Sequence, residues 1–343
     1  GYDACDQTGF DLKTGGACSD SDGIQITTNS SGDSTGDNDG YDYRGQIVSQ
    51  IQRWWAPYLQ FLFSTGNGAP AYGTVAPPSP ATGIAVGAST EFGSTGWDSI
   101  TYTTQIMFND VIPFSNRGPG ARGTNGVDVV AGGAYAAGAE ELNYYSVETW
   151  GAPDGNRSWD SWGGTSRSAP VAGGILALIY QAYKAANGNW PTYDVARALL
   201  MSSATDLHYD TFSQGAGSVN ADRGTAVAGG HYGFFAMPAE WDVGDYRGND
   251  WPGFAHIVYP GDTFTTTISL VNPSTSTIAA NVSDAEMMLI DTKEFTFTVT
   301  PAMVAAESAY GAANRDNFFK AFNFFIPITA TADTSSGSLG TSN

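Results

Sequence analysis

Basic residues and histidine are scarce in this sequence. It contains 14 Lys and Arg against 34 Asp and Glu, which gives a formal net charge of −20 at pH 7. Proteins that bind nucleic acid need clustered Lys and Arg to contact phosphates. The deficit therefore argues against nucleic acid as a partner, whereas the acidic balance favours solubility and the binding of cations.

Long apolar runs are also absent. No stretch approaches the roughly 20 apolar residues that a membrane-spanning helix needs. Charged residues make up only 14% of the chain, while glycine (43 residues), serine, threonine and aromatic residues are abundant. Such polar but uncharged surfaces are common among secreted proteins, so we expect an extracellular or cell-surface location.

Cysteine is almost missing. The two cysteines, Cys5 and Cys18, lie close together in a segment rich in Gly and Asp. A cysteine metal site would need further Cys or His ligands nearby, and none is present. The spacing favours a local disulfide in an oxidising compartment over a metal pair.

The first part of the chain alternates predicted strands with predicted helices. This alternation indicates an α/β domain with a mainly parallel sheet. The expected strands span 23–32, 58–68, 83–90 and 126–133, and the expected helices span 44–55, 166–186 and about 192–204. We expect the aromatic residues near the first helix to belong to the core and not to a ligand platform; they are Trp54, Trp55, Tyr58 and Phe61.

The pattern changes after about residue 235. Residues 256–274 and 294–304 alternate apolar side chains with Thr or Ser, with no strong helix between them. This pattern predicts a β-sandwich domain over 236–343, following a first domain over 1–235. Its expected core consists of Phe264, Ile268, Leu270, Phe295, Phe297 and Val299.

The stretch "SWGGTSRSAPVAGGILALI" (161–179) places a hydroxyl group at the start of an apolar helix. A helix that is apolar all round is a buried one, and Pro170 is expected in its first turn, where proline is tolerated. Ser166 would then lie near the positive end of the helix dipole, which suits a nucleophile that faces a developing oxyanion. The alternative is an N-cap serine that only satisfies free backbone donors.

A series of motifs, in the same order along the chain, resembles the subtilisin-like serine proteases. The nucleophile motif of that family is similar to the stretch around Ser166, and the resemblance extends over about residues 24–224. The other motifs are "FSTGNGAP" (63–70), "SPATGIAVGAST" (79–90), "FSNRGP" (114–119), "DVVAGG" (128–133) and the segment 202–224. The resemblance implies a subtilisin-like, mainly parallel sheet with helices on both faces.

The resemblance also implies roles for individual residues. Ser166 would be the nucleophile, and the Asn67 side chain would complete the oxyanion hole together with the backbone N–H of Ser166. The segment "NSSG" (29–32) is similar to the family's substrate strand, so Ser30, Ser31 and Gly32 would pair with an extended peptide.

The sequence departs from the family in its catalytic Asp and His. Its three histidines are His208, His231 and His256, and all of them follow Ser166, whereas the family's Asp and His come first. Of these, His208 is expected on a surface turn and not at Ser166. We therefore expect a companion N-terminal polypeptide that carries the catalytic Asp and His.

Two functions follow from this reasoning. The first is an extracellular serine endopeptidase that acts on protein or peptide substrates through an acyl-enzyme on Ser166 and is active only with the companion segment. The alternative is a non-catalytic structural component of a cell-surface assembly, which has kept the fold and lost the triad.

An acidic loop suggests a cation site. Carboxylates at short spacing in a flexible loop suit calcium, and members of the resembling family often carry structural Ca²⁺. The candidate ligands are Asp33, Asp37, Asp39 and Asp42. A solvated acidic loop is the alternative.

Overall fold

The structure is a computed structural model in which most of the first 241 residues and parts of the remainder are described. The described residues are 24–32, 42–69, 71–76, 78, 80–90, 110–121, 124–133, 136–139, 159–241, 260–261, 263, 265–280, 295–297 and 330–332. The chain divides into two compact units, Gly1–Ala285 and Glu286–Asn343. This division lies about 50 residues beyond the boundary expected from the sequence, after residue 235.

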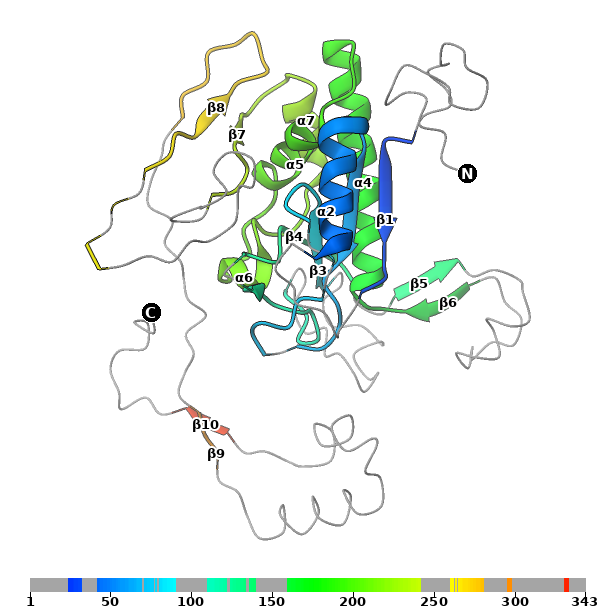
Figure 1. Cartoon of the computed structure of the whole chain (residues 1–343), viewed down its shortest axis with the longest axis vertical. Helices are drawn as coiled ribbons and strands as arrows, with labels where there is room; N and C mark the ends of the chain where they lie inside the picture. Colours follow the sequence, from blue (N-terminus) through cyan, green and yellow to red (C-terminus); the bar gives the residue numbers. More distant parts are fainter. Residues whose placement is uncertain are drawn as a thin grey trace. The chain divides into compact units, whose positions relative to one another are not determined.

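A four-stranded parallel sheet forms the centre of the first unit, with the strand order β1-β2-β3-β4 (Figure 1). The strands are β1 (Ile26–Asn29), β2 (Gln60–Ser64), β3 (Ile84–Ser89) and β4 (Val129–Gly132). Each lies inside a segment predicted as a strand, and β3 is buried along its whole length. A fully buried parallel strand has a nearly continuous apolar sequence, as β3 does, whereas β1 is only partly buried. The predicted α/β class is confirmed.

One long helix, α4 (Thr165–Asn187), packs against all four strands of this sheet. Its buried apolar side chains recur every three or four residues and include Ala169, Ala172, Leu176 and Ile179. The helix is not buried all round as its composition predicted, because Gly174, Ala177 and Leu178 on its other side are exposed. Gly188, in the left-handed region at φ 80°, ends the helix.

Three further helices follow α4, namely α5 (Tyr193–Ser202), α6 (Thr211–Gln214) and α7 (Ala221–Ala228). Both α5 and α7 pack against α4. Leu199 and Leu200 of α5 and Val227 of α7 join the same buried cluster as Leu62 and Val86 of the sheet. No helix among the described residues has both the length and the apolar character needed to cross a membrane.

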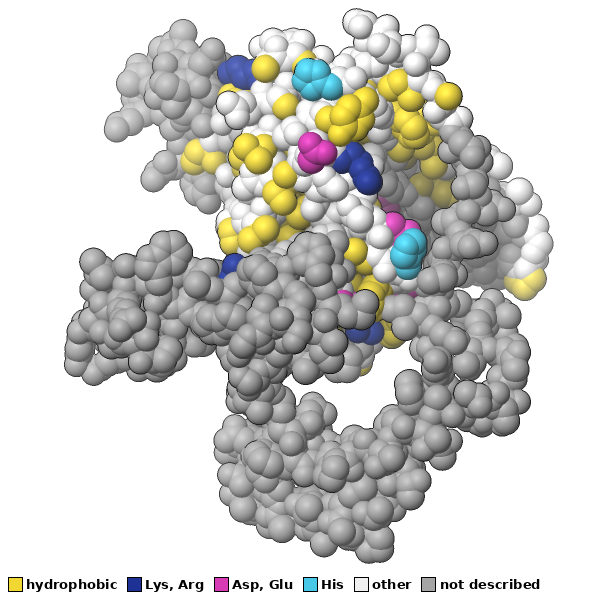
Figure 2. All heavy atoms as spheres, turned by 180° about the vertical axis from the view of Figure 1, so that it is seen from behind, with side chains coloured by type: hydrophobic (Ala, Val, Ile, Leu, Met, Phe, Trp, Pro, Cys, Tyr) yellow, Lys and Arg dark blue, Asp and Glu magenta, His cyan; other side chains and the backbone are white. Residues whose placement is uncertain are grey.

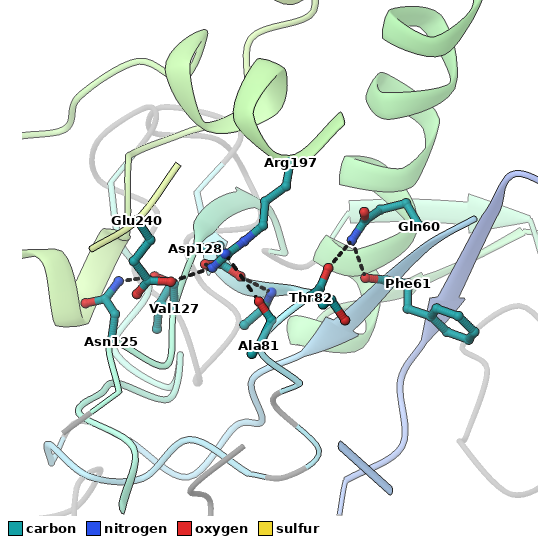
Figure 3. A network of polar contacts seen from close by, with 10 residues as sticks. Gln60, Phe61, Ala81, Thr82, Asn125, Val127, Asp128, Arg197 and Glu240 are labelled. Atoms are coloured by element: carbon teal, nitrogen blue, oxygen red, sulfur yellow. Dashed lines mark hydrogen bonds and ion pairs between the residues drawn. The ribbon is translucent and has the colours of Figure 1, made fainter. Parts of the chain in front are cut away.

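A buried ion network ties α5 to the sheet and to residues after α7 (Figure 3). Arg197 donates to Asp128 and to Glu240, each over 2.5 Å, and Asp128 also accepts the N–H of Ala85 in β3 over 2.7 Å. Burial lowers the pKa of the Arg197 guanidinium, but the charges and hydrogen bonds of Asp128 and Glu240 outweigh it and raise that pKa above its usual value. Arg197 therefore stays charged, and Glu240 is held to α5.

The helix expected over 44–55 forms as α2 (Tyr43–Gln50), continued by a π-helical turn, η1 (Ile51–Trp55). The expectation that Trp54 and Trp55 belong to the core is wrong, because they are 74% and 69% exposed. The extra residue in a π turn shifts the phase of the helix, so the 3.6-residue period does not continue through it. The buried face carries Gly45, Ser49 and Gln52 instead, and Gln52 accepts a hydrogen bond from Thr82 over 2.6 Å.

Short antiparallel ladders make up the remaining described strands. In the first unit, β5 (Ala136–Ala139) pairs with β6 (Trp159–Trp162), and β7 (Phe235–Met237) pairs with β8 (Ser269–Val271). In the second unit, β9 (Phe295–Phe297) pairs with β10 (Ala330–Ala332).

The residues expected in the sandwich core can be compared only in part. Phe264 and Val299 lie outside the described residues. Ile268 and Leu270 are 53% and 45% exposed, so their assignment to a buried core is wrong. Leu270 belongs to β8, which pairs with β7, and in β8 Val271 is the side chain that packs against the main core. The sandwich itself stays a prediction.

Candidate active site

A cleft of about 850 Å³ lies where β1 and β2 end. Ser30 and Gly32, which follow β1, line it together with Ser64 at the end of β2 and the residues after that strand. Thr165 and Ser166, at the start of α4, complete this side of the cleft. The carboxyl ends of parallel strands are the usual place for ligands in open α/β sheets.

Ser166 is the second residue of α4 and is partly buried. The first four N–H groups of a helix have no partner inside the helix, so the N–H of Ser166 is available to an acceptor in the cleft. Gly164, at φ 135°, makes the turn that precedes the helix, and its N–H donates to the carbonyl oxygen of Gly133 over 2.7 Å. The turn thus presents Ser166 at the positive end of a buried helix.

Pro170 does not lie in the first turn as expected, because α4 begins at Thr165. Proline inside a helix leaves the carbonyl four residues earlier without its N–H partner. That carbonyl is the one of Ser166, and the Ser30 hydroxyl donates to it over 3.0 Å. The residue predicted to bind substrate therefore also completes the nucleophile's helical turn.

Asn67 is fixed by its neighbour in the cleft, Thr165. The Asn67 Oδ1 atom accepts both the N–H and the hydroxyl of Thr165, each over 2.8 Å. Its Nδ2 makes no hydrogen bond to any residue in the described part of the chain. Since Oδ1 is committed to Thr165, Nδ2 is the donor that Asn67 offers to a ligand. The motif that pointed to Asn67 gave no sign of this role for Thr165.

The predicted substrate strand lies at the cleft. All three residues are exposed, and Ser30 and Gly32 line the cleft whereas Ser31 does not. The strand before them, β1, is at the edge of the described sheet and pairs only with β2 there. An edge of this kind can accept an added strand.

Neither described histidine lies at the cleft. His208 and His231 are both exposed, and histidine side chains are visible on the molecular surface in Figure 2. The His208 Nδ1 atom is 3.7 Å from a carboxylate oxygen of Asp206. His231 lies beyond the end of α7, and its backbone N–H donates to the carbonyl oxygen of Ala226 in that helix. His256 lies outside the described residues.

Of the four candidate calcium ligands, only Asp42 lies among the described residues. Asp33, Asp37 and Asp39 lie outside the described residues. Asp42 caps α2, because its Oδ1 accepts the N–H groups of Arg44 and Gly45 over 3.0 and 3.1 Å. Its Oδ2 is buried without a hydrogen-bond partner. Within the described ranges, no group of His, Cys, Asp and Glu is arranged to hold a metal.

Comparison with known proteins agrees with this geometry. Residues 2–218 match the Subtilase family. Tripeptidyl-peptidase 2 of Caenorhabditis elegans is 30% identical over 159 residues, which cover 46% of this chain but only 11% of that protein.

Two solved structures are also similar. The patellamide maturation protease PatA is 19% identical over 61% of this chain and 65% of its own, with a TM-score of 0.43. The prenylagaramide maturation protease PagA is 20% identical over 62% and 64%, with a TM-score of 0.42. Since the family match covers more than half of the sequence and spans both Asn67 and Ser166, this chain, with its parallel α/β sheet, belongs to the Subtilase family of serine peptidases.

Proposed function

We propose that this chain is the serine-bearing part of an extracellular endopeptidase that cleaves peptide bonds through an acyl-enzyme on Ser166. One observation carries the proposal. Thr165 holds Oδ1 of Asn67, so the Asn67 amide nitrogen and the Ser166 N–H at the start of α4 are both left to donate at one end of the cleft. The composition of the chain supports the extracellular location.

The chemistry follows from these groups. The Ser166 Oγ attacks the carbonyl carbon of the scissile peptide, and the carbonyl oxygen becomes an oxyanion. The Ser166 N–H and the Asn67 Nδ2 donate hydrogen bonds to this oxyanion, and they do so without reorganising because the helix and Thr165 already hold them. The base that takes the Ser166 proton gives it to the leaving nitrogen, so the C–N bond breaks, the amine departs and the acyl-enzyme ester remains. Water, deprotonated by the same base, then attacks the ester carbonyl, which releases the carboxylic acid and restores the Ser166 hydroxyl.

The proton of Ser166 needs a base, and we propose that a companion N-terminal segment supplies a His with an Asp behind it. The exposed positions of His208 and His231 support this assignment. A catalytic base must come within about 2.6–3.2 Å of the serine oxygen, or slightly further in the absence of substrate. Intact mass and peptide mapping of the purified material would identify a companion segment that bears both residues.

Labelling with a fluorophosphonate probe tests the nucleophile. In material that contains the companion segment, the probe should label the native chain, and Ser166→Ala should abolish the label. Ser168→Ala is the matched control, because Ser168 lies one half-turn further along α4 and is buried. Labelling that survives Ser166→Ala would contradict the assignment. A native chain that resists the probe with the segment present would favour the structural, non-catalytic component.

Product analysis tests the endopeptidase specificity. The similar protein from Caenorhabditis elegans is named a tripeptidyl-peptidase, so release of tripeptides is the specificity to distinguish. We expect cleavage of internal bonds in peptides with an acetylated N-terminus. If the products are only tripeptides released from free N-termini, the endopeptidase proposal is wrong and the activity is that of a tripeptidyl-peptidase.

A further inference from the structure

We propose that Asn116 is a positioning residue that holds the oxyanion loop, which we define as residues 65–68, and through it Asn67. The inference rests on the role proposed for Asn67 above. Asn116 belongs to the segment "FSNRGP", lies at the cleft and is only 5% exposed.

Asn116 contacts the oxyanion loop on both sides of Asn67. Its Oδ1 accepts the N–H of Gly68 over 2.6 Å, and its Nδ2 donates to the carbonyl oxygen of Thr65 over 2.9 Å. Its backbone N–H donates to the carbonyl oxygen of Gly66 over 3.0 Å. Asn116 therefore bonds to the residue after Asn67 and to the two residues before it, which fixes the loop from which the Asn67 side chain projects.

The loop backbone is shaped to receive this amide. Gly66 adopts φ +101°, a conformation that L side chains rarely take, and a Cβ at this position would overlap the Nδ2 atom of Asn116. Glycine at 66 thus serves two needs, the left-handed turn and the space for the Asn116 side chain.

Asn116 is itself anchored to the sheet. The neighbouring Ser115 is fully buried, and its Oγ accepts the N–H of Ala88 in β3 over 2.9 Å. The N–H of Ile112 donates to the carbonyl oxygen of Ala88 over 3.0 Å. The segment 112–116 therefore connects a rigid buried strand to the oxyanion loop.

Asn116 acts through Asn67 and not on the oxyanion. Its side chain is directed to the loop, since Oδ1 accepts from Gly68 and one N–H of Nδ2 donates to Thr65. An oxyanion donor must lie within about 2.7–3.1 Å of the oxyanion, so a small displacement of the loop would weaken the hydrogen bond from Asn67. Loss of the Asn116 amide should for this reason lower kcat with little effect on KM.

Amide hydrogen exchange of the folded chain tests the contact without any need for activity. Asn116→Ala should accelerate exchange at Gly68 by about tenfold or more, because its N–H loses a buried acceptor. Asn220→Ala is the matched control. Asn220, at the start of α7, also makes two side-chain hydrogen bonds, one with the N–H of Arg223 and one with the hydroxyl of Thr205, and it does not line the cleft. This control should leave Gly68 unchanged. Unaltered exchange at Gly68 in Asn116→Ala overturns the proposal.

A double-mutant cycle in the active complex tests the positioning role. Asn116→Ala should reduce kcat by about tenfold with KM within about twofold, and it should have no further effect in the Asn67→Ala background. An equal loss in both backgrounds would show a general structural effect and overturn the inference. Absence of turnover in the native complex would contradict the proposed function alone, and the exchange measurement would still decide whether Asn116 holds the loop.

Discussion

The hydroxyl of Ser30 donates a hydrogen bond of 3.0 Å to the carbonyl oxygen of Ser166. This oxygen would have no partner in α4, because Pro170 lacks the N–H that an ordinary helix residue would supply. The bond joins the proposed nucleophile to the segment proposed to hold the substrate backbone. The proposed substrate strand and the proposed nucleophile are thus linked by one side chain.

Ser30→Ala should lower kcat/KM by a factor of about two to ten, which corresponds to the loss of one neutral hydrogen bond. Ser31→Ala is the control, since Ser31 is exposed and does not line the cleft. Pro170→Ala would return an N–H to the helix, so Ser30→Ala should cost less in that background. Steady-state kinetics on a peptide substrate measures kcat/KM for the Ser30, Ser31 and Pro170 variants. Equal losses of kcat/KM for Ser30→Ala and Ser31→Ala would contradict the role of the Ser30 hydroxyl.

Asn67→Ala should lower kcat by about 10²–10³-fold with little change in KM, because the amide donates mainly to the transition-state oxyanion. Thr165→Ser keeps the hydroxyl that bonds to Asn67 and should cost far less. A loss confined to KM would show that Asn67 binds the ground state instead.

Arg197→Met should lower the free energy of unfolding by about 3–5 kcal/mol, because it removes the cation that pairs with the buried carboxylate of Asp128 and with Glu240. Arg223→Met is the comparison, since Arg223 donates to a single carbonyl, that of Ala204. Urea denaturation measures both variants. Similar losses in the two would mean that the Arg197 network contributes no more than the single hydrogen bond of Arg223.

A chain that ends at Ala285 should melt at nearly the same temperature as the full chain. A chain that ends at Phe235 should melt lower, because it loses the pairing of β7 with β8 and the ion pair between Arg197 and Glu240. Circular dichroism against temperature compares them. Equal melting of the two shortened chains would place the boundary after residue 235, as the sequence pattern predicted.

We also propose that the acidic loop binds structural calcium, with the buried Oδ2 of Asp42 as one ligand. Added Ca²⁺ should raise Tm, because a ligand that binds only the folded state stabilises it by about 2.7 kcal/mol at a hundred times its Kd. Replacing Asp37 and Asp39 together by Asn should remove this shift, and Asp222→Asn should not. If neither added Ca²⁺ nor a chelator changes Tm, the loop is solvated and does not bind calcium.

The sequence predicted those elements whose signal is local. The strands β2, β3 and β4 are short apolar runs bounded by turn residues, and α4 is a long apolar helix between glycines. The buried face of α2 could not be predicted, because its buried residues, Gly45 and Ser49, are small or polar and carry no hydrophobic signal. The π turn after α2 then exposes Trp54 and Trp55, which no helical period could indicate.

The site was predictable only at the residues that motifs mark. Asn67 and Ser166 stand in recognisable motifs, and the structure places both at one cleft. Their support comes from contacts between distant segments, such as Thr165 with Asn67, which are 98 residues apart, and Asn116 with Thr65, which are 51 apart. Periodicity reports only on neighbours within a few residues, so it cannot reveal such pairs.

The cleft combines segments as far apart as Ser30 and Ser166, which are separated by 136 residues. Contacts of such long range form late in folding, because the loops between them must close first. An unfinished copy of this chain therefore offers cleavable peptide bonds but has no assembled catalytic groups. Under the proposed function, self-digestion in the presence of the companion segment then needs one folded and one unfolded molecule, so its rate should follow the product of the two populations. It should be fastest at the midpoint of unfolding and slow on either side.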